Sequence, residues 1–170
     1  MLPLSIASAT GTLVAQAIGA QQLETARRIG NDGIRLAALV SVAIGLVVWF
    51  TREAIIRAYS PNPAIIAAAL PLFAFISFYQ LFDAIQVTAA FVLRAYKIAI
   101  VPTIIYALAL WGVGLGGGYA LGFDLLGLTP PGLRGAAGFW FGNSVSIALV
   151  AIGLLWYLRV IQHKLQRPGR

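Results

Sequence analysis

One acidic residue lies inside an otherwise apolar stretch, and its position favours ion binding. Asp83 is the only carboxylate between Ala64 and Leu93. A charge near the centre of a membrane-spanning helix costs about 2.5–3.5 kcal/mol on insertion scales, so such residues face the protein interior or a water-filled cavity and usually serve a function. The sequence therefore predicts that Asp83 has a functional role within the membrane.

Three polar side chains share one helical face with Asp83. Gln80, Asp83 and Gln86 are spaced i, i+3 and i+6, and Tyr79 lies one turn before Asp83, which puts all four on one stripe. Tyr79, Gln80 and Gln86 are therefore candidates for lining a cavity around the carboxylate. The alternative is structural, in which Asp83 only joins helices through hydrogen bonds to neighbouring Ser, Thr or Gln side chains.

The composition predicts an integral membrane protein. Hydrophobic residues make up 60% of the chain and charged residues only 10%, outside the range of ordinary soluble domains. The formal net charge is +7, but the Lys and Arg residues are scattered between apolar runs instead of lining one face, which argues against nucleic acid as a partner. The absence of cysteine excludes disulfides and thiol catalysis.

Five apolar segments are long enough to cross a bilayer, which requires about 20 helical residues. They cover residues 2–20, 34–51, 64–93, 98–122 and 136–158. We interpret residues 21–33 as a loop with Gly30 and Gly33 as helix breakers, and residues 52–63 as a second connection. Pro71 offers a bend in the third span, because proline removes a backbone donor. The predicted fold is an all-α, polytopic bundle of five transmembrane helices.

Small residues recur at helical spacing on the first and last spans. Ser8, Thr12 and Gln16 form a polar face suited to helix packing or to a cavity wall, so Gln16 is a further cavity-lining candidate. Gly138, Gly142 and Ser146 recur every four residues on the last span and predict a packing face.

The fourth span contains a glycine-rich stretch. Gly112, Gly114 and Gly117 match the glycine spacing of a dinucleotide-binding loop. The match lies in an apolar run with no preceding strand and no acidic residue about 20 positions later, so we reject that interpretation. Close helix packing and a deformable hinge are the two alternatives.

The basic residues predict the orientation in the membrane, since cytoplasmic loops carry an excess of Lys and Arg. Nine lie on one side of the five spans and three on the other. The first group is Arg27, Arg28, Arg35, Arg94, Lys97, Arg159, Lys164, Arg167 and Arg170, and the second is Arg52, Arg57 and Arg134. We expect a cytoplasmic C-terminus in the inner (plasma) membrane, and a chain that is a piece of a longer protein.

Sequence signatures of enzymes are missing. There is no P-loop, no H-E-x-x-H and no G-x-S-x-G motif, and the single histidine, His163, is interpreted as a surface residue. We expect no enzymatic activity and no cofactor. Ion-coupled transport remains, in which one intramembrane carboxylate binds a proton or Na⁺ and releases it when a cationic substrate or a conformational change competes for the site.

One stretch reads Gln80-Leu81-Phe82-Asp83-Ala84-Ile85-Gln86-Val87 and is followed by Leu93-Arg94-Ala95-Tyr96-Lys97. It is the most specific of four stretches that resemble a known family, the multidrug and toxic-compound extrusion (MATE) transporters, and it is similar to their tenth helix and the loop after it. Residues 3–19 are similar to the end of the eighth helix, residues 111–119 to the eleventh and residues 135–142 to the start of the twelfth.

This resemblance implies about a dozen spans in two six-helix lobes that rock around a central cavity and export small organic cations in exchange for Na⁺ or H⁺. Asp83 matches the cation-coupling aspartate of the C-terminal lobe. The chain would then be helices eight to twelve, with membrane lipid and a separate N-terminal lobe as partners.

Two alternatives to this function remain open. One is a lipid-linked glycan flippase of similar architecture, which would usually require a more cationic cavity. The other is a non-transporting helix-packing fragment that associates with another lobe.

Overall fold

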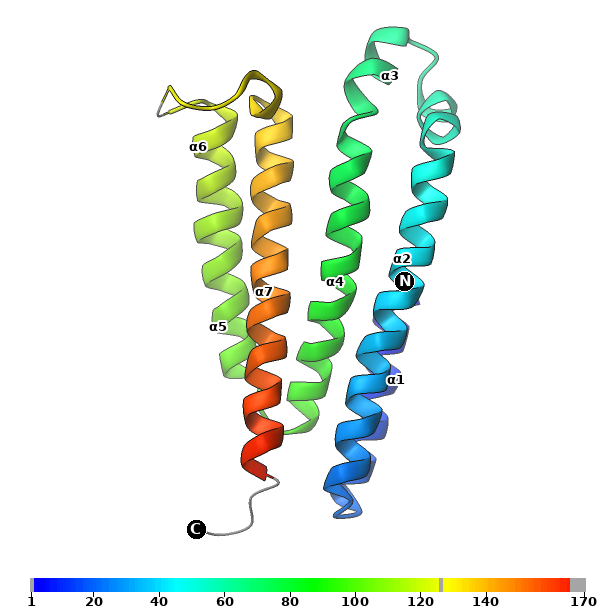
Figure 1. Ribbon diagram of the computed structural model, residues 1–170, viewed down its shortest axis with the longest axis vertical. Helices are drawn as coiled ribbons and strands as arrows, with labels where there is room; N and C mark the ends of the chain where they lie inside the picture. Colours follow the sequence, from blue (N-terminus) through cyan, green and yellow to red (C-terminus); the bar gives the residue numbers. More distant parts are fainter. Residues whose placement is uncertain (1, 126, 166–170) are drawn as a thin grey trace.

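The computed structural model describes residues 2–125 and 127–165, which form helices joined by short connections (Figure 1). In chain order the elements are α1 (Leu2–Gly19), α2 (Leu23–Tyr59), α3 (Pro63–Ala69), α4 (Leu72–Ala95), α5 (Ile100–Leu108), the π-helical segment η1 (Ala109–Gly117), α6 (Gly118–Gly122), the 3₁₀ turn η2 (Pro131–Leu133) and α7 (Ala136–Leu165). These described residues include no β-strand, so the predicted all-α class is confirmed.

Five helical segments are long and apolar enough to cross a membrane, which confirms the predicted number of spans. They are Leu2–Gly19, Leu23–Tyr59, Pro63–Ala95, Ile100–Gly122 and Ala136–Leu165. The third combines α3 and α4, and Pro71 lies in the turn between these two helices. Figure 1 shows the spans running along the long axis of the molecule, with the connections at its two ends.

The second span is longer at both ends than the sequence indicated. The predicted loop over residues 21–33 is wrong, because α2 begins at Leu23, and the predicted connection over residues 52–63 shrinks to residues 60–62. A Cβ at Gly30 would lie 3.2 Å from Cγ1 of Val92, and a Cβ at Gly33 would overlap the side chain of Thr10. Close packing on α4 and α1 thus outweighs the cost of about 1 kcal/mol that glycine brings to a helix interior.

Helix α4 packs against three of the other four spans. It contacts α1, α2 and α7, while η1 and α6 pack against α7. All of its buried residues lie between positions 84 and 93, where Val92 joins Val14 of α1 and Leu154 of α7 in one apolar core. Residues 72–83 include no buried side chain. Neighbouring helices therefore enclose α4 over its C-terminal half only.

The contact of α7 with η1 and α6 depends on small residues on both sides. A Cβ at Gly142 would lie 2.6 Å from the backbone nitrogen of Gly118, and a Cβ at Gly114 would lie 3.1 Å from Oγ of Ser146. A Cβ at Gly138 would lie 2.7 Å from the backbone nitrogen of Gly122. The helix backbones touch along this line, because no side chain separates them.

The connection between α6 and α7 is held by Asp124. Its Oδ1 accepts a hydrogen bond from the backbone N–H of Thr129 at 2.8 Å, and its Oδ2 lies 2.7 Å from Nη2 of Arg134. The Thr129 hydrogen bond, aided by the charge of Arg134, holds the pKa of this carboxyl below its usual value. Asp124 is therefore ionised at neutral pH and ties the fourth span to the fifth.

The backbone contact at Gly142 can be tested by adding one methyl group. We predict that Gly142→Ala destabilises the chain by about 1–3 kcal/mol, because the new Cβ collides with backbone atoms that cannot move independently. Thermal and denaturant unfolding in detergent would measure the change. Gly112→Ala is the matched control, since a Cβ at Gly112 meets no atom within 4 Å. Equal stability of the two variants would contradict the contact.

Candidate functional site

Asp83 lies at the point of α4 where the enclosed half begins. Its side chain is half-buried and the next residue, Ala84, is fully buried. Nε2 of Gln86 donates a hydrogen bond to Oδ1 of Asp83 at 3.2 Å, and Gln86 itself is only 7% exposed. The helical spacing thus brings a buried amide onto the carboxylate and restricts its orientation.

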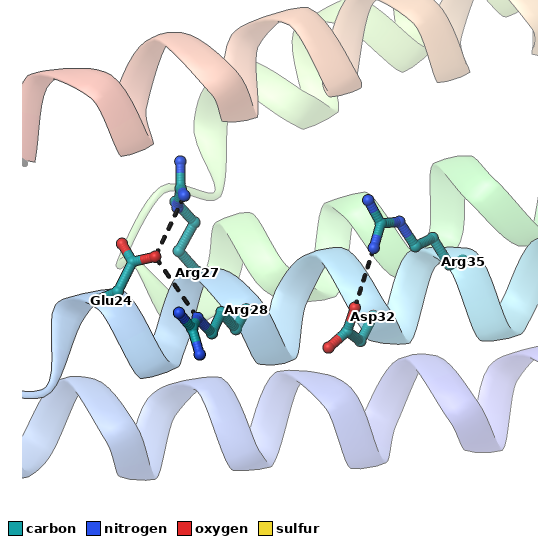
Figure 2. A network of polar contacts seen from close by, with 5 residues as sticks. All are labelled: Glu24, Arg27, Arg28, Asp32 and Arg35. Carbon is teal, nitrogen blue, oxygen red and sulfur yellow. Dashed lines mark hydrogen bonds and ion pairs between the residues drawn. The ribbon is translucent and has the colours of Figure 1, made fainter.

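Asp83 differs from the four other carboxylates of the chain in its charge balance. The others form ion pairs with arginine: Glu24 with Arg27 at 3.2 Å, Asp32 with Arg35 at 3.4 Å, Glu53 with Arg57 at 2.7 Å and Asp124 with Arg134 at 2.7 Å. Figure 2 shows the first two pairs on α2. Within residues 2–125 and 127–165, Asp83 has the Gln86 hydrogen bond and no ion pair. An uncompensated carboxylate in apolar surroundings is suited to bind a proton or an external cation.

Aromatic contacts between α4 and α7 lie one and two turns before Asp83. The ring of Tyr79 meets that of Trp140 edge to face, with centroids 6.5 Å apart and an interplanar angle of 90°. Phe75 and Phe141 form a similar pair at 6.4 Å and 83°. Such pairs stabilise helix contacts beyond the area that they bury. Gln80 is half-buried on the same turn as Tyr79.

Two cavities are lined by residues of this group and its neighbours. The first, of about 400 Å³, lies between η1 and α7 and is lined by Leu110, Trp111, Gly114, Leu115, Phe139, Trp140 and Asn143. The second, of about 350 Å³, is bounded by α1, α4, α5 and α7, and its polar lining residues are Gln86, Arg94, Thr103 and Tyr106. Asp83 is linked to the second cavity through Gln86 and to the first through Tyr79 and its partner Trp140. Both volumes suit small molecules.

Gln16 does not join the Asp83 group. Helix α1 packs through Ala7, Gly11, Val14 and the other residues on that face, so the face with Ser8, Thr12 and Gln16 is exposed. Sequence periodicity identified two faces on this helix but could not decide which of them meets the bundle. The expected place of Gln16 in a cavity wall is therefore not found in the described part of the chain.

The glycine-rich segment of the fourth span has two kinds of position. Gly114 lies against Ser146, whereas an added Cβ at Gly112 or Gly117 would meet no atom within 4 Å. The close-packing interpretation therefore does not describe Gly112 and Gly117. Both lie in η1, where the backbone is π-helical over residues 109–117, and π-helical segments are frequent at functional sites.

Four residues that line the cavities were not recognised as site residues from the sequence. Trp140 and Asn143 come from α7, and Thr103 and Tyr106 come from α5. Thr103 and Tyr106 are polar, three positions apart and inside an apolar span, so their spacing was a usable signal. Trp140 carried only the signal of an interfacial aromatic residue, because its contact with Tyr79 joins distant parts of the chain.

The donor set around Asp83 suits a hard monovalent ion better than a transition metal. The described residues contain no group of three or more His, Cys, Asp or Glu side chains that could hold a metal ion. Carboxylate, amide and phenol oxygens are available on Asp83, Gln86 and Tyr79, and oxygen ligands are preferred by hard cations. The geometry is compatible with Na⁺ and with protonation of the carboxylate.

Comparison with known proteins decides the family. The family model called MatE matches residues 1–120, which include α1 to α5 and the Asp83 group. The chain belongs to the MatE family. This match confirms the resemblance to the MATE transporters that residues 80–97 indicated.

Bacterial MatE relatives match nearly the whole chain. The probable multidrug resistance protein NorM of Aromatoleum aromaticum is 39% identical over 98% of this chain and 35% of its own length. The multidrug resistance protein PmpM of Pseudomonas aeruginosa is 38% identical over 91% of this chain and 32% of its own length. The multidrug resistance protein NorM of Vibrio vulnificus is 36% identical over 94% of this chain and 35% of its own length. The chain thus spans about a third of the length of these MatE proteins.

A solved structure has the same helix arrangement. The eukaryotic MATE transporter AtDTX14 aligns with a TM-score of 0.82 over 93% of this chain and 34% of its own, at 21% sequence identity. The five spans therefore have the arrangement of a segment of a MatE transporter.

Proposed function

We propose that the chain is part of a secondary multidrug efflux antiporter that exchanges Na⁺ or H⁺ for organic cations, with Asp83 as the coupling-ion site. The observation that supports this most strongly is the lack of an ion-pair partner for Asp83 among the described residues, in contrast to the four paired carboxylates. The names of the NorM and PmpM relatives support multidrug efflux as the activity.

The proposed mechanism is a competition for one negative charge. In one conformation Asp83 holds a proton or Na⁺, while Gln86 fixes the carboxylate through its 3.2 Å hydrogen bond. In the other, a substrate cation or a shift of α4 lowers the affinity and the coupling ion leaves. The aromatic rings of Trp111, Phe139 and Trp140 line the first cavity, and aromatic faces attract organic cations.

Two incompletely covered surfaces favour a further lobe. Residues 72–83 of α4 include no buried side chain, and the α1 face with Ser8, Thr12 and Gln16 is exposed. We propose that the remaining part of a MatE transporter covers both. The same surfaces favour the second candidate, a non-transporting packing module. The glycan flippase is less well supported at the Asp83 group, because Arg94 is the one basic residue that lines the two cavities beside Asp83.

The basic residues are divided unequally between the two ends of the bundle. Seven basic residues of the described chain lie at the end with the α1–α2 and α4–α5 connections, namely Arg27, Arg28, Arg35, Arg94, Lys97, Arg159 and Lys164, against Arg52, Arg57 and Arg134 at the other. Arg167 and Arg170 lie outside the described residues. We propose that the first end is cytoplasmic in the plasma membrane.

The Asp83 assignment can be tested in a chimaera in which this chain replaces the matching third of the Aromatoleum relative. We predict that Asp83→Asn abolishes export of a cationic dye from cells, while the chimaera still inserts, because the amide keeps the shape but cannot carry the exchangeable charge. Glu53→Gln, which changes an exposed carboxylate of α2, is the matched control and should export normally. Normal export by Asp83→Asn would exclude the assignment.

The orientation can be tested because the chain has no cysteine. A single cysteine in place of Gly132 probes the end with the α6–α7 connection, and one in place of Lys164 probes the opposite, basic end. Both positions are exposed. A membrane-impermeant maleimide should label Gly132→Cys on intact cells and Lys164→Cys only after lysis. The reverse pattern would show that the basic end faces outward.

A further inference from the structure

A third cavity lies between α2 and α7, away from Asp83 and at the end of the bundle where the basic residues gather. Its volume is about 390 Å³. Polar side chains from both helices line it, with Arg27, Asn31 and Arg35 on α2 and Arg159, Gln162 and His163 on α7. We refer to it as the α2–α7 cavity. Neither the proposed coupling site nor the two cavities beside it includes any of these residues.

Positive charge exceeds negative charge around the α2–α7 cavity. Glu24 is shared by two arginines, with Arg27 at 3.2 Å and Arg28 at 3.7 Å. Arg35 is paired with Asp32 at 3.4 Å, but both side chains are more than 70% exposed, so water and salt screen this pair. Arg159 forms no ion pair within the described residues. Figure 2 shows Arg27 and Arg35 extending from α2 on the side of α7.

Two groups with hydrogen-bond donors are buried at this cavity. Nε of Arg27 is buried and has no hydrogen-bond partner among the described residues. Gln162 is only 6% exposed, and its amide interacts with the hydroxyl of Tyr96. Because the amide nitrogen carries two N–H groups, one of them remains for a further acceptor. Buried donors are normally satisfied, so these two groups favour an acceptor that binds in the cavity.

The floor of the cavity is apolar. Ile34 is 9% exposed and Leu158 is 2% exposed, and Leu155 lies beside them. Towards the middle of the membrane, α2 exposes Leu36 and Leu39, and α7 exposes Ile152 and Trp156. A ligand that fits this site has an anionic head for the donors and apolar chains for the surface below it. A free phosphate ion would use only the first of these features.

We propose that the α2–α7 cavity binds the phosphate headgroup of an anionic phospholipid. The guanidinium groups of Arg35 and Arg159 and the amide of Gln162 donate to the phosphate oxygens, and the acyl chains lie along the exposed apolar residues of α2 and α7. Basic pockets between membrane helices near the surface suit such headgroups, because charge-assisted hydrogen bonds are strong where water is partly excluded. This site is independent of the coupling chemistry at Asp83.

Competition binding in neutral detergent tests the proposal. Fluorescently labelled phosphatidylglycerol is bound to the purified chain, and its displacement by unlabelled phosphatidylglycerol, phosphatidylcholine and glycerol 3-phosphate is followed by anisotropy. Phosphatidylglycerol should compete at least tenfold better than phosphatidylcholine, and glycerol 3-phosphate should not compete in the same range. Equal competition by phosphatidylcholine would overturn the site. Equal competition by glycerol 3-phosphate would make it a free-anion site instead.

Charge variants locate the binding. The double variant Arg35→Gln/Arg159→Gln should weaken binding about tenfold, and Arg159→Lys in the Arg35→Gln background should recover part of it. The matched control is Arg52→Gln/Arg57→Gln at the opposite end, which should bind normally. Circular dichroism and gel filtration confirm that each variant is folded. Unchanged binding by the folded double variant would overturn the proposal.

Two further measurements keep the result decisive. If the double variant does not fold, Gln162→Leu removes a single buried donor and should weaken binding about threefold, whereas unchanged binding by that variant would contradict the site. The NorM chimaera is measured in the same way and should bind the labelled lipid as the chain does. If the isolated chain binds the lipid and the chimaera does not, another protein segment fills the cavity in the longer protein. That result would contradict the proposal.

Discussion

The arrangement depends on one constraint, which is that a carboxylate placed among apolar helices requires a partner for its charge. Four of the chain's carboxylates meet this requirement with arginines, three of them along α2 and one in the connection between α6 and α7. Asp83 has a neutral amide instead, at 3.2 Å. A hydrogen bond orients the carboxylate but does not neutralise it, so its charge remains available to an ion from outside the chain. The transport proposal rests on this difference.

The packing of α4 places Asp83 at a boundary. Its C-terminal half is held in a core formed with α1, α2 and α7, and its N-terminal half has no buried residue. On the other side of the molecule, the glycine and serine line between α7 and the η1–α6 segment fixes those helices at backbone contact. Two tightly packed regions thus flank a helix that is only half enclosed, and the ion site lies where the enclosure begins.

The sequence predicted the five spans correctly, because the length of an apolar run is a local property that a bilayer imposes directly. It also predicted that Asp83 and Gln86 lie together, because a separation of three residues along a helix fixes the distance between two side chains. It failed at the start of α2, where Gly30 and Gly33 were interpreted as breakers but serve contacts with Val92 and Thr10. Local propensity cannot reveal such contacts, because the partners lie on other helices.

Gln16, Trp140 and the α2–α7 cavity illustrate the same limit for sites. The polar face of α1 was visible in the sequence, but whether it points inward depends on where α2 and α4 pack. The Tyr79–Trp140 contact and the α2–α7 cavity each join residues at least 60 positions apart. Only the fold brings such residues together, whereas the Asp83 stripe is contained within two turns of one helix.

The most direct test of the ion-exchange role of Asp83 is the release of its coupling ion. Tetraphenylphosphonium would be added to the purified NorM chimaera in weakly buffered detergent solution, and released H⁺ and Na⁺ would be measured with a pH indicator and a sodium electrode. The account predicts that binding of the organic cation releases one of the two ions, and that Asp83→Asn abolishes this release. Undiminished release by Asp83→Asn would contradict it.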